Sequence, residues 1–177
     1  MEGKTPISPQ EQKIETKRAG DTVTIFSPQG EKITLTILKV GSSAQEAALL
    51  GIGVTKDIPI YYLDKNLLFM DAGIGHGGDH IVMFPSSTEQ ELRHELIHSV
   101  ELSYRPTQEV LDLYERVKII VSENSFYDAD GETYNFKKDI HEFIVDGYNH
   151  AWFISALKKE GLYDEFLKAT EYMHIVK

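Results

Sequence analysis

Alternation of polar and apolar residues predicts strands in the first half of the chain. Thr22–Phe26 ends at the turn-forming composition Ser-Pro-Gln-Gly, and the alternating segment Lys32–Val40 is expected to be its hairpin partner. A short helix over Gln45–Leu50, stopped by Gly51, comes next. Three short apolar stretches follow it: Ile58–Leu63, Leu67–Met70 and Ile81–Phe84. Residues 21–84 are therefore expected to form a small mixed sheet.

From Pro85 onward the apolar positions follow helical spacing. Thr88 and the two serines before it are each followed three residues later by Glu or Gln, which is the capping-box signature. The first helix is expected over 88–104, because Pro106 prevents its continuation. Three more helices are predicted from the apolar periodicity: Gln108–Ser122, Asp139–Lys159 and Tyr163–Ile175.

The expected fold is thus α+β, in one domain spanning 1–177. Residues 1–20 are a polar lead-in of flexible character, 21–84 the strand-rich half, and 85–177 the helical half. Glu123–Lys137 has the composition of a loop. Three apolar residues at helical spacing in the third helix are predicted to lie in the core: Trp152, Phe153 and Leu157.

Composition narrows the functional classes. The chain has no cysteine, which excludes disulfides, cysteine zinc sites and a thiol nucleophile. A net charge of -10 argues against nonspecific nucleic-acid binding, which needs clustered Lys and Arg. No apolar run approaches the roughly 20 residues of a membrane span. Any transition-metal site must therefore use His and carboxylate ligands.

The segment His94-Glu95-Leu96-Ile97-His98 carries such a site. Residues i and i+4 of a helix share one face, so both imidazoles can reach one metal ion. Glu95 is offset by about 100° and can act as general base on a water at that ion without ligating it. Imidazole and carboxylate ligands suit zinc. The alternative is two solvated histidines on a surface helix, but Leu96 and Ile97 supply an apolar face that would bury them.

A third protein ligand must come from elsewhere, because the residues after His98 lack the Gly and His of the His-x-x-Gly-x-x-His continuation. Glu142 in the third predicted helix can supply it. Asp146 lies one turn further on the same face, where it can accept the outer N–H of a ligand histidine. Glu142 also fits a capping pattern with Asp139, and His141 is a rival donor that points about 100° away. The sequence predicts one Zn²⁺, held by both histidines and Glu142.

His-Glu-x-x-His followed on a separate helix by Glu-x-x-x-Asp resembles the gluzincin metallopeptidases. The longer match is to the catalytic domain of anthrax lethal factor and the related Pro-Pro endopeptidases. The segment Glu142–Tyr148 and its separation from His98 are similar to that family, and the resemblance covers Ile81–Val176. It implies a zincin-like fold and a zinc endopeptidase acting at proline-containing segments. It also implies a protein that is secreted or delivered to a host cell, its leader lying outside this sequence; the alternative is a cytoplasmic protein.

The resemblance further implies a tyrosine that helps to stabilise the oxyanion. Tyr134 is the nearest match, one residue farther from Glu142 than in the family, and Tyr127 and Tyr148 are the alternatives. In the expected mechanism, zinc lowers the pKa of a water. Glu95 takes the proton of that water and delivers it to the leaving amine.

The strand before the zinc helix lines the cleft in metallopeptidases of this kind. Its counterpart here is Ile81-Val82-Met83-Phe84, which is expected to pair with an extended peptide or protein substrate. Two other functions stay open: a zinc hydrolase with another substrate, and a zinc-binding regulatory domain without turnover. Glu95 argues against the second, because a structural zinc site needs no base. The oligomeric state is open as well.

A glycine-rich connection holds His76 and His80 between the second and third apolar stretches. It lacks the spacing and the following helix of a phosphate-binding loop. Two histidines in such a loop are a weak signal for a second metal site. Structural or solvated roles are therefore expected for both.

Overall fold

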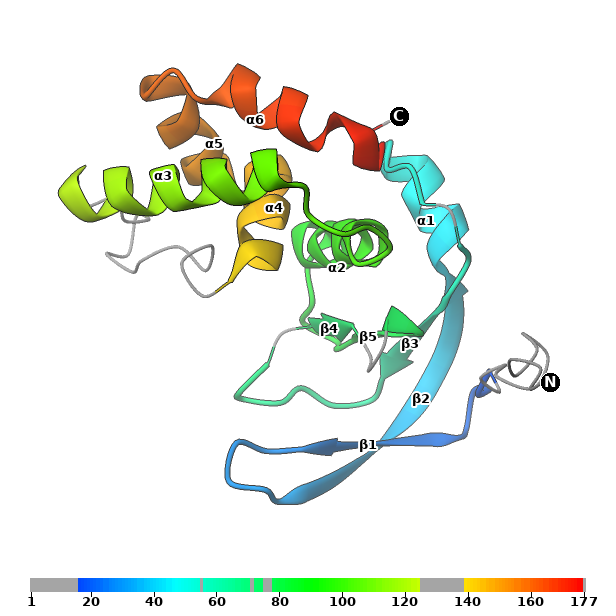
Figure 1. Ribbon diagram of the computed structural model, residues 1–177. Helices are drawn as coiled ribbons and strands as arrows, with labels where there is room; N and C mark the ends of the chain where they lie inside the picture. Colours follow the sequence, from blue (N-terminus) through cyan, green and yellow to red (C-terminus); the bar gives the residue numbers. More distant parts are fainter. Residues whose placement is uncertain (1–15, 55, 71, 75–77, 125–138, 177) are drawn as a thin grey trace, which may run out of the picture.

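The structure is a computed structural model that describes residues 16–54, 56–70, 72–74, 78–124 and 139–176 (Figure 1). It has a layer of helices above a curled mixed sheet, and the hairpin of the first two strands, β1 (Thr22–Phe26) and β2 (Lys32–Ser42), extends away from the helices. The predicted combination of a strand-rich first half and a helical second half is confirmed. Among the described residues, no helix is long and apolar enough to cross a membrane.

One five-stranded sheet has the order β1-β2-β3-β5-β4. β1 (Thr22–Phe26) and β2 (Lys32–Ser42) form an antiparallel hairpin, and β3 (Pro59–Leu63) pairs antiparallel with β2. β5 (Ile81–Met83) then runs parallel to β3, and β4 (Ala72–Ile74) lies antiparallel at the far edge. The register of β2 shifts between Ile37 and Lys39, and a bulge of this kind bends a strand.

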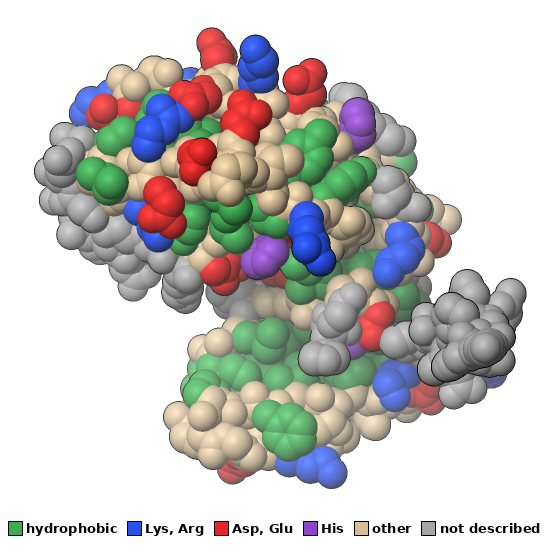
Figure 2. Space-filling view, in the orientation of Figure 1, with side chains coloured by type: hydrophobic (Ala, Val, Ile, Leu, Met, Phe, Trp, Pro, Cys, Tyr) green, Lys and Arg blue, Asp and Glu red, His purple; other side chains and the backbone are tan. Residues whose placement is uncertain are grey.

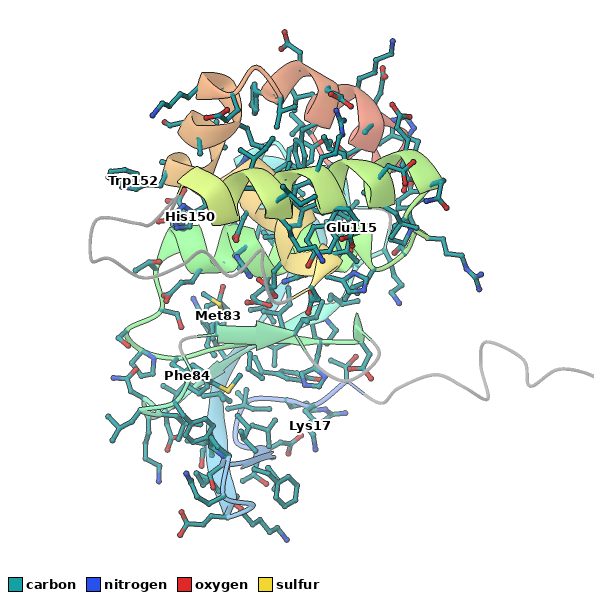
Figure 3. All side chains as sticks on the ribbon, turned by 60° about the vertical axis from the view of Figure 1, so that its left-hand side comes forward. Lys17, Met83, Phe84, Glu115, His150 and Trp152 are labelled. Carbon is teal, nitrogen blue, oxygen red and sulfur yellow. The ribbon has the colours of Figure 1, made fainter. Side chains whose placement is uncertain are left out.

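The prediction that Ile81, Val82, Met83 and Phe84 form a substrate-binding edge is wrong. Each residue of β5 has a partner on both β3 and β4, so the strand is interior. The backbone of Phe84 is also occupied, because its N–H donates to the Ser87 hydroxyl and its carbonyl accepts from the Ser87 N–H. Met83, the last residue of β5, and Phe84 after it are both buried (Figure 3). The edge beside the helices is β4.

Successive residues of the central strands β3 and β5 point to opposite faces of the sheet, and both faces are apolar there. Ile60, Ile81 and Met83 face the helices and join the main core. Tyr61 and Val82 face the other side, where they pack with residues of the hairpin and of neighbouring strands: Val23, Leu35, Ile37, Leu63 and Phe84. The hairpin is thereby tied to the body of the protein through a second core.

The helices are α1 (Ser43–Leu50), α2 (Glu89–Glu101), α3 (Gln108–Asn124), α4 (Ile140–Asn149), α5 (Ala151–Lys159) and α6 (Tyr163–Thr170), followed by the 3₁₀ turn Glu171–Met173. The capping box predicted for α2 is confirmed. The Thr88 hydroxyl accepts from the Glu91 N–H at 3.1 Å, and the Glu91 carboxylate accepts from the Thr88 N–H at 2.6 Å. This fixes where α2 begins and thus the register of its central residues.

A single helix over Asp139–Lys159 is wrong, because the chain breaks at His150. Its backbone is extended (φ -98, ψ 111), so it ends α4 and starts α5. The break allows α5 to fold back, so that Phe153 packs 5.9 Å from Phe143 between ring centroids. Of the predicted core group, Phe153 and Leu157 are buried, whereas Trp152 is half exposed and projects from the start of α5 (Figure 3).

The second predicted apolar stretch is a turn rather than a strand. Leu67 and Met70 form an isolated bridge, and the strand that follows, β4, lies in the glycine-containing segment after them. Gly73 sits in the middle of β4 and pairs with Val82. A period-two apolar pattern is absent there, so pairing with β5 rather than local propensity accounts for this strand.

Candidate metal centre

Helix α2 presents His94 and His98 on one face. Their ring centroids are 4.8 Å apart. Leu96 and Ile97 between them are completely buried in the main core, and they hold this part of the helix against the protein. The predicted apolar anchoring of the motif is confirmed, and the alternative of two solvated histidines is excluded, since His98 is only 6% exposed.

Helix α4 brings Glu142 to these histidines. Asp139 caps the helix by accepting from the Glu142 N–H at 2.9 Å, which leaves the Glu142 side chain free to turn inward. Its Oε1 lies 3.2 Å from Nε2 of His94, and its Oε2 lies 3.0 Å from Nε2 of His98. One ligand atom of each residue lies within 4.8 Å of the other two, which is close enough for one metal ion.

Opposite charges interact strongly in this cluster. Burial by itself would raise the pKa of the Glu142 carboxyl, but the imidazoles of His94 and His98 outweigh it and hold that pKa well below its usual range. Burial would likewise lower the pKa of His98, yet its hydrogen bonds to Glu101 and Glu142 raise it to about 10. The hydrogen bond to His98 occupies Oε2 of Glu142, whereas the buried Oε1 has no hydrogen-bond partner among the described residues. A cation with affinity for nitrogen and oxygen would give this oxygen a partner.

Glu95 lies beside the cluster without belonging to it. The side chain is 8% exposed and borders the same cavity as His94 and Glu142. Burial raises the pKa of the Glu95 carboxyl, and the nearby histidines offset this only in part. A carboxylate with a raised pKa is suited to exchanging protons near neutral pH.

The cluster opens into a cavity of about 440 Å³ between the helices and the sheet edge. From the sheet side, β4 contributes Ala72 and the turn before it contributes Phe69 and Met70. The helical side is lined by residues of α2, α4 and the break after α4: Gln90, Glu91, His94, Glu95, Glu142, Asp146, Asn149 and His150. Figure 2 shows the surface hollowed between the helices and the strands below them.

Two predicted site residues lie in different places from the ligand cluster. His141 points away from it and contacts Oε1 of Glu101 at 2.8 Å, so His141 is not the third ligand. Tyr148 lines another cavity and shares a hydrogen bond of 2.5 Å with Thr170, so it is excluded as the oxyanion tyrosine. Tyr134 and Tyr127 lie outside the described residues, and Tyr134 stays a prediction.

Asp146 is buried and lines the cavity of the cluster. The outer nitrogen of His98 contacts Glu101 instead, with 2.9 Å between Nδ1 and Oε2. The predicted role of Asp146 therefore applies only to His94, and it stays a prediction there. His80 takes a structural role, because it pairs with Asp79 and its ring lies beside Tyr61; His76 lies outside the described residues.

Glu101 is the residue that the sequence motif did not reveal. It is the last residue of α2, it is completely buried, and it contacts two histidines. Its spacing of three residues from His98 is a usable signal, because i and i+3 are neighbours on a helix. The contact with His141 depends on how α4 packs on α2, which the spacing does not reveal.

Comparison with known proteins adds no relative. No family model, curated protein or solved structure matches this chain. The function is therefore inferred from the residues and the geometry of the site itself.

Proposed function

We propose that this protein is a zinc-dependent endopeptidase. The observation that carries the proposal is the convergence of His94, His98 and Glu142 on one point, with the buried Glu95 beside them in an open cavity. Two imidazoles and one carboxylate are a ligand set typical of catalytic zinc, which leaves a fourth position for water.

The donor chemistry of the site fits zinc in two respects. The nitrogens that face Glu142 are both Nε2 atoms, the usual ligand atoms of an i, i+4 histidine pair. Glu142 adds one negative charge, and a site without cysteine excludes thiolate-dependent metals. When bound, zinc would supply Lewis acidity, which lowers the pKa of a water and polarises a substrate carbonyl.

Glu95 is proposed to handle the protons of the reaction. Its carboxylate accepts a proton from the attacking water and delivers it to the amine that leaves. Burial raises the pKa of the Glu95 carboxyl, and a raised pKa brings a carboxyl closer to the working pH of a general base. This role also argues against a zinc-binding regulatory domain, in which a buried glutamate beside the ligands would be a cost without a function.

The substrate is proposed to bind as an extended segment along β4. This strand is the edge of the sheet next to the helices, and Ala72 lines the cavity. An added strand gains main-chain hydrogen bonds at such an edge, while pockets for alternate side chains give selectivity. Phe69 and Met70 offer apolar surface for one of those side chains. Cleavage near proline and a role for Tyr134 remain proposals that follow from the family resemblance.

Digestion of a diverse peptide library tests the function. Zinc-loaded protein is expected to cut peptides internally, a strong chelator to stop cleavage, and added zinc to restore it. Cleavage that persists after the metal has been removed and its absence verified by elemental analysis would rule out a zinc mechanism.

A further inference from the structure

Glu101 makes an unusual pair of contacts at the end of α2. Its side chain has no exposed surface, and both carboxylate oxygens face imidazoles. Oε2 lies 2.9 Å from Nδ1 of His98, and Oε1 lies 2.8 Å from Nδ1 of His141. The carboxylate therefore bridges helix α2 to the first turn of α4.

These contacts determine which nitrogen of each ring carries hydrogen. A carboxylate only accepts hydrogen bonds, so Nδ1 of each ring must donate. In the neutral form of His98, the lone pair is then on Nε2, the atom that faces Glu142. The bond to Glu101 thus presents the nitrogen of His98 that a metal at this site requires.

The position of Glu101 is unfavourable for stability alone. The C-terminal end of a helix carries partial negative charge, which repels a carboxylate. Burial of a carboxylate adds a desolvation cost. An apolar residue at the end of α2 would avoid both costs. Residues that are unfavourable for stability are concentrated at functional sites. A requirement of the metal site therefore explains why a buried carboxylate lies at the end of α2.

We propose that Glu101 and His141 are positioning residues for the metal centre. Glu101 fixes the tautomer and the orientation of His98. His141 holds the second oxygen of Glu101 and, through it, anchors the turn of α4 that carries Glu142. His141 is adjacent to Glu142 in sequence, so one bridge aligns ligands from both helices. The inference rests on the proposed metal site.

Zinc affinity of single and double variants tests this role. Glu101→Gln keeps the size of the side chain and removes its charge. We expect zinc affinity to fall by about 10–100-fold, the usual effect of losing the hydrogen-bond partner of a ligand histidine. His141→Gln acts only through Glu101, so we expect a smaller loss of about 3–10-fold, below the range for a residue that contacts a ligand histidine directly. The double variant should bind no more weakly than Glu101→Gln alone, since the residues act in series.

The matched control is Glu115→Gln on α3 (labelled in Figure 3), because the exposed Glu115 pairs with Lys118 and has no part in the ligand cluster. It should bind zinc with wild-type affinity. Cobalt provides a readout of geometry: the visible absorption of the cobalt-loaded protein should change in Glu101→Gln and stay unchanged in Glu115→Gln. Unfolding of each metal-free variant shows that the compared chains are folded.

Wild-type zinc affinity and an unchanged cobalt spectrum in Glu101→Gln would overturn the inference. If Glu101→Gln does not fold, His141→Gln decides, because its side chain is partly exposed and its loss should be tolerated. Wild-type affinity in that variant would overturn the shared role. If the wild-type protein binds no zinc, the proposed function and this inference are both overturned. If the wild-type protein binds zinc and the variants bind it equally well, this inference alone is overturned and the proposed zinc peptidase stands.

Discussion

Oε2 of Glu142 lies 3.0 Å from Nε2 of His98, which joins the third proposed ligand on α4 to the motif on α2. Glu142→Gln removes the charge of that ligand while preserving its size. We expect zinc affinity to fall by more than about 100-fold. Even the loss of a residue that only hydrogen-bonds to a metal ligand lowers the affinity by about 10–100-fold. Competition with a chromophoric chelator measures the affinity, with Glu115→Gln as the control. Equal affinities of Glu142→Gln and the wild type would exclude Glu142 as a ligand.

Phe69, in the wall of the cavity, is expected to contact a side chain of the substrate. Phe69 is 38% exposed and lines the cavity from the sheet side. If a substrate side chain covers about 50 Å² of this ring, Phe69→Ala loses about 1.3 kcal/mol of binding, close to a tenfold decrease in kcat/KM. Phe26→Ala is the control, because Phe26 is exposed on β1 and does not line the cavity. A decrease of the same size in both variants would mean that Phe69 has no particular contact with substrate.

The contact of α4 with α6 requires glycine at position 147. A Cβ on Gly147 would approach Phe166 Cζ to 2.1 Å, and Phe166 is completely buried. Gly147→Ala should therefore destabilise the protein by about 1–3 kcal/mol through overpacking, although alanine is favoured over glycine in a helix by about 1 kcal/mol. Chemical denaturation measures the change.

Two further variants test the cause of that change. Ser155→Ala, at an exposed position of α5, should leave stability unchanged or slightly higher, since alanine is the better helix former. Phe166→Leu makes room beside position 147, so the double variant should lose less stability than the sum of the two single changes. Strict additivity would show that the steric contact is not the cause.

The stability that Asp57 contributes to the folded protein is expected to depend on pH. Its carboxylate accepts from the Ser42 hydroxyl at 2.7 Å and from the Ala44 N–H at 3.1 Å, at the start of α1. These hydrogen bonds lower the pKa of Asp57 from its ordinary value of 3.8. A lowered folded-state pKa stabilises the protein above pH 3.8, and this stability is lost as the pH falls through the folded value.

Asp57→Asn should therefore be less stable than the wild type at pH 7, by less than about 1 kcal/mol because the group is exposed to solvent. The difference should shrink as the pH falls below 3.8. Urea unfolding of both proteins at several pH values measures it, with Asp112→Asn as a control for an exposed aspartate away from this cap. A difference independent of pH would mean that the charge of Asp57 does not stabilise α1.

Local patterns predicted the parts of the site that lie on single helices. The i, i+4 spacing of His94 and His98 and the capping box of α2 are properties of one segment, so the sequence was sufficient for them. Glu142 was predictable because Glu142 and Asp146, both with carboxylate side chains, lie on the same face of one helix. Its approach to α2 is a tertiary contact, and there the need of a metal ion for a third ligand, rather than helix propensity, indicated the residue that lies beside both histidines.

The incorrect predictions concern features that tertiary contacts create. The break at His150 has no adjacent proline or glycine to mark it, and the packing of Phe153 against Phe143 accompanies it. The edge strand β4 spans three residues with Gly73 at its centre, so pairing with β5 creates it. Neither the packing of two aromatic rings nor the pairing of two strands can be predicted from a local pattern along the sequence.

The decisive experiment concerns the proposed role of Glu95. Wild-type protein and Glu95→Gln are each loaded to one zinc per chain, verified by elemental analysis, and their turnover of the same cleaved peptide is compared. If Glu95 is the general base, the variant retains its zinc and its kcat falls by at least about 100-fold, the contribution typical of a general base. Wild-type kcat in a fully zinc-loaded Glu95→Gln protein would contradict it.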